Sequence, residues 1–132
     1  MHKGGCLCGK VQYEYHGEIG ELVMCHCSQC RKAQGSAFAA NSPVEARKFF
    51  ITRGAKFLKK YRSSSNKARV FCGHCGSAMY SVLDEAPQVK RLRLGTLETL
   101  ESVPTAYHIY YTSKARWYDM EDSHPRFTEE KE

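Results

Sequence analysis

The sequence has no long hydrophobic run and no leader-like start. No apolar stretch approaches the ~18 residues that a membrane-spanning helix needs. The opening residues MHKGGC lack the apolar centre of a secretory signal peptide. Internal repeats and strong helical periodicity are missing as well. We therefore expect a cytoplasmic protein in a reducing compartment, with no membrane among its partners.

A complete set of disulfides within the chain is also excluded, because the number of cysteines is seven. A reducing compartment disfavours disulfides in any case. The cysteines form three short motifs, Cys-x-Cys, Cys-x-Cys-x-x-Cys and Cys-x-x-Cys, at Cys6 and Cys8, at Cys25, Cys27 and Cys30, and at Cys72 and Cys75. These spacings let neighbouring thiolates converge on one ion at a Zn–S distance of ~2.3 Å. The motifs therefore predict metal sites, and zinc is the metal that best fits them.

Seven thiols can be divided between two zinc sites in more than one way. Zinc takes four ligands in a closed structural site and three protein ligands in a reactive one. One division joins the two Cys-x-x-Cys pairs, 27/30 and 72/75, as in a zinc ribbon, and leaves Cys6, Cys8 and Cys25 unused. The other joins the first and last motifs, and leaves the central three cysteines with one open position. Spacing alone leaves both divisions open, with a modest preference for the second because it uses every thiol.

The remaining sequence is typical of short strands. At 132 residues the chain is expected to be one domain, residues 1–132. Alternating apolar residues in KVQYEY predict a half-buried strand. Other strand candidates are FAANS, KFFIT, KFLKKY, ARVFC, SAMYSVL, VKRLRLG and AYHIYY. A helical turn is expected in SQCRKAQG, with Ser28 as its N-cap and Gly35 as its end. The pattern predicts a mainly β fold of packed sheets.

These motifs, taken in order, resemble the family of glutathione-dependent formaldehyde-activating enzymes, which includes centromere protein V. The resemblance runs through GGCLCGKVQYEY, CHCSQCRKAQGSAF, YRSSSNKARVFCGHCGSAMY, LGTLE, YHIYYTSKARWY and HPRF. It implies a twisted β-sandwich of the Mss4-like type, built from short antiparallel strands with zinc-bound loops.

The resemblance also implies which cysteines share each zinc. The family's structural zinc corresponds to Cys6, Cys8, Cys72 and Cys75. Its catalytic zinc corresponds to Cys25, Cys27 and Cys30. We therefore expect two zinc ions per chain, with the three central cysteines as the catalytic residues.

The implied activity is that of a carbon–sulfur lyase or synthase acting on a glutathione–aldehyde adduct of the S-hydroxymethylglutathione type. The expected partners are a small thiol, glutathione, and an aldehyde. A thiol that binds zinc loses its proton, and the resulting thiolate can attack an aldehyde carbon to give a hemithioacetal. Three thiolates and Zn²⁺ sum to −1, so nearby donors or cations are needed, and the candidates are Arg31, Lys32 and the N-terminal first turn of the short helix.

A second hypothesis is a catalytically inactive, zinc-stabilised binding module for an anionic partner. The formal net charge is +6, and basic residues gather at Arg53, Lys56, Lys59, Lys60, Arg62, Lys67 and Arg69. We interpret this run chiefly as a solvated strand face, and next as a weak site for an anionic ligand. Nucleic acid is not favoured as a partner, because few aromatic residues are interleaved with these cations.

His26 has three open interpretations. It could complete a Cys3His site, it could assist proton transfer, or it could be structural or face solvent. An extended backbone would turn its ring away from the flanking Cys25 and Cys27, which favours the third interpretation.

Overall fold

Two β-sheets make up the structure, a computed structural model that describes residues 1–131. The smaller sheet has three antiparallel strands in the order β1-β2-β5. These strands are β1 (His2–Gly5), β2 (Gln12–Tyr15) and β5 (Phe49–Arg53). Tyr13 and Tyr15 are buried on one face of β2, as the alternation in KVQYEY predicts.

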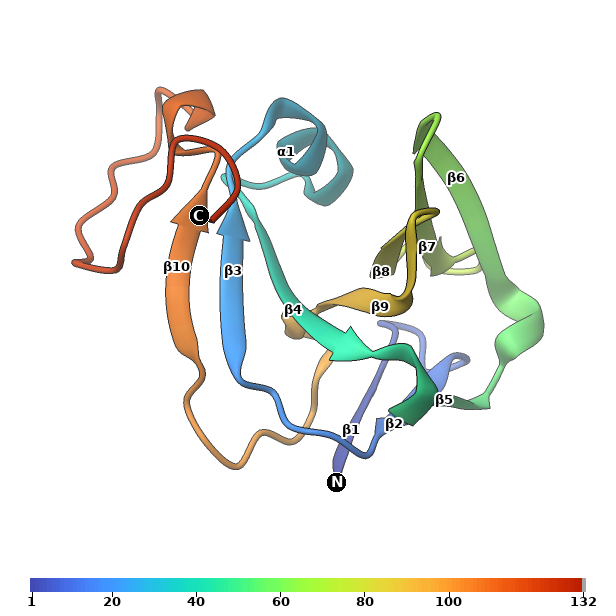
Figure 1. Ribbon diagram of the computed structural model, residues 1–132. Helices are drawn as coiled ribbons and strands as arrows, with labels where there is room; N and C mark the ends of the chain where they lie inside the picture. Colours follow the sequence, from blue (N-terminus) through green and yellow to red (C-terminus); the bar gives the residue numbers. More distant parts are fainter. Residues whose placement is uncertain (132) are drawn as a thin grey trace.

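The larger sheet has seven strands in the order β10-β3-β4-β9-β8-β7-β6. Its strands are β3 (Glu21–Cys25), β4 (Ala39–Glu45), β6 (Leu58–Ser64), β7 (Lys67–Cys72), β8 (Ala78–Leu83), β9 (Ala86–Arg93) and β10 (Thr105–Ile109). Register shifts interrupt the β6–β7, β7–β8 and β8–β9 pairings, and such bulges increase strand bending and twist. Figure 1 shows the resulting curvature, with β10 and β3 on one side and β6 on the other.

β3 and β10 run parallel, whereas the other strand pairs of this sheet are antiparallel. Their register places Val23 beside Tyr107 and Cys25 beside Ile109. Because side chains alternate across a strand, these four residues share one face of the sheet. His108 lies on the opposite face, and this separation decides which groups can reach the cysteines of β3.

Two hydrophobic clusters form the core. The larger one lies between the two sheets and includes Tyr13, Met79 and Leu92, all essentially inaccessible to solvent. The smaller one packs beside β3 and β10, around Cys25 and Cys30. Cysteines from all three sequence motifs, Cys6, Cys25, Cys30 and Cys72, therefore lie within the packed interior.

One α-helix, α1 (Ser28–Gln34), follows β3. Gly35 ends it in the left-handed conformation with φ 62°, which confirms the predicted helix end. The predicted N-cap is wrong. Cys27 rather than Ser28 is the cap, and its Sγ accepts a hydrogen bond from the Cys30 backbone N–H. Short 3-10 turns complete the structure at η1 (Ala46–Lys48), η2 (Ala55–Phe57), η3 (Leu94–Thr96) and η4 (Tyr111–Ser113).

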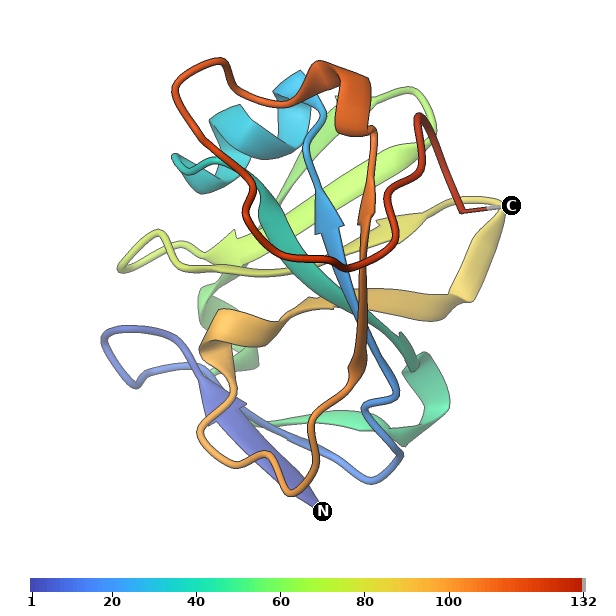
Figure 2. The same cartoon turned by 90° about the vertical axis from the view of Figure 1, so that its left-hand side faces the viewer.

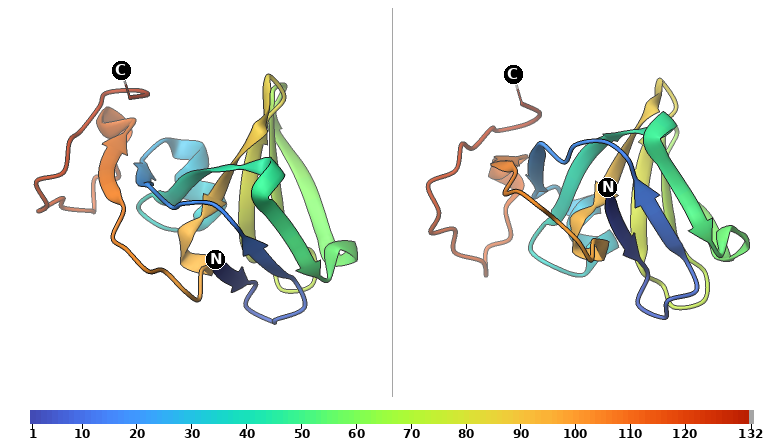
Figure 3. Two further views of the ribbon diagram at one scale, coloured as in Figure 1. Left: turned by 60° about the horizontal axis from the view of Figure 1, so that its bottom comes forward. Right: turned by 90° about the horizontal axis from the view of Figure 1, so that it is seen from below.

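After η4, the chain returns along β10. The His108 N–H donates to the Pro125 carbonyl at 2.8 Å, and the Phe127 N–H donates to the His108 carbonyl at 2.9 Å. Figure 2 shows this C-terminal segment crossing β3 and β10, and Figure 3 shows it on the side of the molecule away from β6. It protects what would otherwise be an open sheet edge.

The β-sandwich predicted from the sequence is confirmed, and every predicted strand segment contributes to a strand. Two strands were not predicted, β1 and β3. Within residues 1–131, no helix has both the length and the apolar character needed to cross a membrane.

Candidate metal centres

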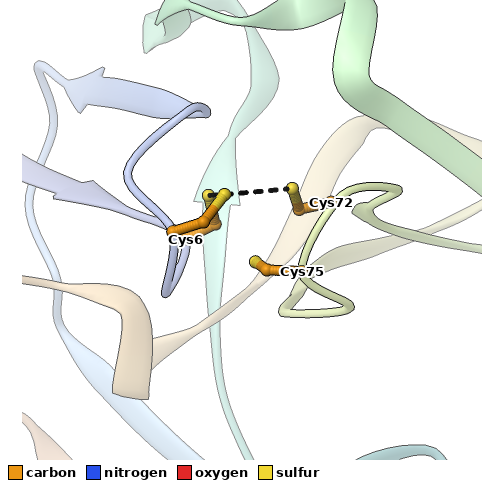
Figure 4. Close-up of side chains that lie close together, drawn as sticks. Cys6, Cys72 and Cys75 are labelled. Carbon is orange, nitrogen blue, oxygen red and sulfur yellow. Dashed lines mark hydrogen bonds between the residues drawn. The ribbon is translucent and has the colours of Figure 1, made fainter.

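The first candidate centre gathers Cys6, Cys8, Cys72 and Cys75, whose Sγ atoms all lie within 4.8 Å of one another. The Cys6–Cys8 and Cys8–Cys72 sulfur separations are 3.5 and 3.9 Å. A tetrahedron of Zn–S bonds of ~2.3 Å places neighbouring sulfurs about 3.8 Å apart. The geometry therefore fits a four-thiolate metal ion, and Figure 4 shows the Cys6, Cys72 and Cys75 sulfurs facing a common centre.

Two short turns present these four sulfurs. In the first turn, the Cys6 N–H donates to the Val11 carbonyl at 3.0 Å, and the Val11 N–H donates to Cys6 Sγ at 3.3 Å. In the second, the Gly76 N–H donates to the Cys72 carbonyl at 2.8 Å. Ser77 Oγ lies 3.3 Å from Cys75 Sγ, and this hydrogen bond lowers the pKa of Cys75 to about 5. A metal ion here would join the two sheets, because β1 and β7 belong to different sheets.

The second candidate centre gathers Cys25, Cys27 and Cys30, again with all Sγ atoms within 4.8 Å of one another. Cys25 ends β3, Cys27 caps α1, and Cys30 lies in its first turn. Within residues 1–131, no histidine, aspartate, glutamate or further cysteine joins this group. We call these three residues the thiol trio. A metal ion bound here would have three protein ligands and one coordination position left for another molecule.

The thiol trio lies in the wall of a pocket with a volume of about 490 Å³. Apolar walls come from Val23, Tyr107 and Ile109 on β3 and β10 and from Tyr110. Polar and charged side chains complete the lining at Asn41, Lys67, Arg69, Arg91 and Glu130. Its size and mixed lining are typical of a small-molecule site.

Two buried arginines, Arg69 on β7 and Arg93 on β9, lie near the thiol trio. The Arg69 guanidinium lies 3.8 Å from Cys30 Sγ through Nη2, and only 9% of the residue is exposed. Arg93 is also buried, and it donates to Gln34 Oε1 on α1 at 2.9 Å. Hydrogen bonds from Cys25 and Cys27 lower the pKa of Cys30, and the charges of Lys67 and Arg69 lower it further. The thiolate is therefore favoured on Cys30, whereas hydrogen bonds with Cys27 and Cys30 raise the pKa of Cys25.

The two cations that the sequence offered as candidates are not those found in the pocket. Arg31 and Lys32 do not line the pocket. The Arg31 side chain instead donates through Nε to the His26 carbonyl at 3.2 Å. The expected solvated strand face is likewise wrong for Arg69, which β7 turns into the interior.

His26 faces away from the thiol trio. Its Nε2 lies 2.8 Å from His108 Nδ1, and its ring packs near Phe38 and Tyr118. Burial lowers the pKa of His26 to about 4, and His108 and Lys114 act in the same direction. Of the three interpretations that the sequence left open, the geometry favours a structural role.

A family model described as "Glutathione-dependent formaldehyde-activating enzyme" matches residues 1–113. The chain belongs to this formaldehyde-activating family. The match includes all seven cysteines and most of the pocket lining, and it confirms the resemblance that the cysteine motifs indicate.

Two similar proteins, one known from its sequence and one from its crystal structure, support the assignment. An uncharacterized lyase of Schizosaccharomyces pombe is 26% identical over 127 residues, which cover 96% of this chain and 90% of the yeast protein. A crystal structure of a Rhodobacter sphaeroides protein superposes with a TM-score of 0.62 at 25% identity. That superposition covers 75% of this chain and 90% of the bacterial one.

Proposed function

We propose that this formaldehyde-activating family member is a zinc-dependent carbon–sulfur lyase or synthase that acts on a glutathione–aldehyde adduct of the S-hydroxymethylglutathione type. In this proposal residues 1–132 act as one catalytic domain that holds two zinc ions. The thiol trio carries the proposal, because three convergent sulfurs open onto a pocket of about 490 Å³. The family assignment and the lyase name of the yeast relative support it.

The two cysteine groups have different roles in this proposal. Cys6, Cys8, Cys72 and Cys75 hold a closed structural zinc, which braces the two sheets against each other. Cys25, Cys27 and Cys30 hold the catalytic zinc. When bound, a zinc ion with three thiolate ligands supplies one open position at which an incoming thiol becomes a thiolate at neutral pH.

The chain's own residues prepare the pocket for this chemistry. Arg69 places a positive charge against Cys30 Sγ, which offsets the negative charge gathered by several thiolates. Ile109 and Tyr110 form an apolar wall beside the sulfurs that limits access of water to the reacting carbon. In the synthetic direction a carbon–sulfur bond forms between the thiol and the aldehyde carbon, and the carbonyl oxygen gains the proton. The lyase direction reverses both changes.

Metal analysis and kinetics together test the proposal. Protein purified anaerobically should contain two zinc ions per chain, and a folded Cys27→Ser variant should contain one. The wild-type protein should accelerate adduct formation from glutathione and formaldehyde above the uncatalysed rate, and Cys27→Ser should not. A wild-type protein with both metal ions but no acceleration, over a panel of aldehydes, would contradict the proposal.

A second candidate is a zinc-stabilised binding module for an anionic partner. It is favoured by the net charge of +6 and by the cations that line the pocket. Binding to an anionic polymer that weakens steeply with salt, and that survives Cys27→Ser unchanged, would support this alternative over the enzyme.

A further inference from the structure

The pocket beside the thiol trio contains more cationic side chains than its sulfurs require. Four basic residues gather there, at Lys67, Arg69, Arg91 and Arg93, and the first three line the pocket directly. Arg69 contacts Cys30, and buried Arg93 is held between Gln34 and Ser81. These two guanidiniums can offset the net charge of about −2 that three thiolates, a divalent cation and a bound thiolate would carry.

Lys67 and Arg91 remain without an anionic partner. Within residues 1–131, neither side chain forms an ion pair with an aspartate or glutamate. Both are only partly exposed. Burial lowers the pKa of Lys67, against the opposing effect of Cys30. A desolvated ammonium beside a guanidinium is unfavourable unless an anion joins them, so this part of the pocket is suited to a negatively charged group.

Two further residues of the pocket lining offer oxygen acceptors. Glu130 contributes a carboxylate to the lining. Asn41 also lines the pocket and is 5% exposed, yet its Oδ1 has no hydrogen-bond partner within the described residues. A buried acceptor without a donor is costly, so it is suited to an amide N–H or an ammonium of a ligand. A phosphate dianion would gain nothing from these two acceptors, whereas a carboxylate next to an amide or amine matches both the cations and the acceptors of the lining.

We propose that the pocket selects thiols that carry a carboxylate, and that Lys67 and Arg91 bind this carboxylate while the sulfur reaches the thiol trio. This inference rests on the proposed function, since it concerns the thiol that occupies the open position. It assigns specificity to β7 and β9 and metal binding to β3 and α1. The side chains of the two strands therefore set the binding preference among thiols, and the thiol trio provides the same chemistry for every thiol that binds.

Thiol binding to the zinc-loaded protein tests the inference. Calorimetry would compare glutathione with glutathione diethyl ester, whose thiol is retained and whose carboxylates are masked, and with 2-mercaptoethanol. We expect glutathione to bind at least tenfold more tightly than its diester, because hydrogen bonds to charged groups contribute most to such selectivity. Lys67→Gln and Arg91→Gln should each reduce this preference about tenfold.

Two matched controls separate pocket recognition from general charge. Lys60→Gln and Arg53→Gln remove exposed cations that do not line this pocket, and both should keep the preference for glutathione within twofold. S-methylglutathione provides a readout that does not depend on thiolate formation, because its sulfur is blocked. Its binding to the wild-type protein should weaken with added salt and should weaken further in Lys67→Gln and Arg91→Gln.

The possible outcomes distinguish this inference from the proposed function. Equal affinities of the wild-type protein for glutathione, its diester and 2-mercaptoethanol would overturn the inference and leave the lyase proposal standing. An unchanged preference in both Lys67→Gln and Arg91→Gln would do the same. Failure of the zinc-loaded wild-type protein to bind any thiol would overturn the proposed function itself.

Discussion

The Arg69 guanidinium lies against the Cys30 sulfur, with Nη1 and Nη2 at 3.9 and 3.8 Å from Sγ. Its Nε donates to Ser63 Oγ at 3.0 Å, which fixes the plane of the group. The two contacting residues are 39 positions apart in the sequence. β7 thus delivers a buried positive charge to a sulfur cluster built by β3 and α1.

Replacing Arg69 should weaken metal binding at the thiol trio and leave the other centre unaffected. Loss of a group that supports a metal ligand typically costs about 10–100-fold in affinity. We therefore expect Arg69→Met to release one zinc ion at a 10–100-fold lower chelator concentration, with Arg69→Lys in between. Arg62→Met is the matched control, because Arg62 is exposed and pairs with Asp84 away from the trio. Equal release from Arg69→Met and wild type would contradict the role of Arg69.

The two cysteine groups should differ in their effect on stability. Cys8 and Cys72 are 64 positions apart, so a metal ion that joins them restrains much of the unfolded chain. Apparent binding free energies at structural zinc sites are ~10–16 kcal/mol, more than many domains of this size have in total. We expect Cys72→Ser to prevent cooperative thermal unfolding near the wild-type midpoint, whereas Cys27→Ser should retain it. Differential scanning calorimetry of both variants in excess zinc would check this contrast.

The sequence predicted the fold class because its strand signals are local. KVQYEY alternates, and its Tyr13 and Tyr15 are buried. The strand at Glu21–Cys25 escaped prediction because its burial does not alternate and its parallel partner is 84 positions away. No local pattern encodes such a pairing. The Cys27 cap escaped as well, because thiols are seldom considered N-caps and Ser28 has the usual chemistry.

The sequence also predicted the sulfur ligands, but it did not predict which cations surround them. Short spacing brings Cys25, Cys27 and Cys30 together wherever the chain folds. Lys67 and Arg69 belong to a basic run. Strand periodicity predicts that their side chains share one face of the strand, but it does not predict whether that face is buried or exposed. In the structure, this face of β7 lies toward the thiol trio, and Arg69 contacts Cys30.

A close backbone approach holds the loop of the first cysteine motif. Gly54 has φ +77°, and a Cβ built on it would lie 1.8 Å from the Lys10 carbonyl oxygen. Gly54→Ala should therefore destabilise the protein by more than the ~1–2 kcal/mol of a left-handed residue alone. Gly35→Ala is the matched control, because φ is +62° there with open space around the Cβ. Urea unfolding of both variants gives the comparison, and equal losses would show that the Lys10 loop moves freely.

A hydrogen-bond chain ties the C-terminal segment to the back of β3. His26 Nε2 lies 2.8 Å from His108 Nδ1, and His108 Nε2 lies 3.0 Å from both carboxylate oxygens of Asp122. Both imidazoles are fully buried. Burial acts to raise the pKa of Asp122, but hydrogen bonds from His108 and from the His124 N–H outweigh it and lower the pKa. The ionised carboxylate is therefore the form that stabilises the fold.

Removing the Asp122 carboxylate should destabilise the protein in a pH-dependent way. Because the folded pKa lies below the unfolded value of ~3.9, the stabilisation is complete above about pH 5 and is lost as pH falls through the folded pKa. Asp122→Ala should cost about 1–3 kcal/mol at pH 7, since it leaves a buried imidazole without a partner. Asp119→Ala is the control, because Asp119 is exposed. Urea titrations from pH 7 downward should show the gap between Asp122→Ala and wild type narrowing only at acid pH, and a gap that widens on acidification would contradict an ionised Asp122.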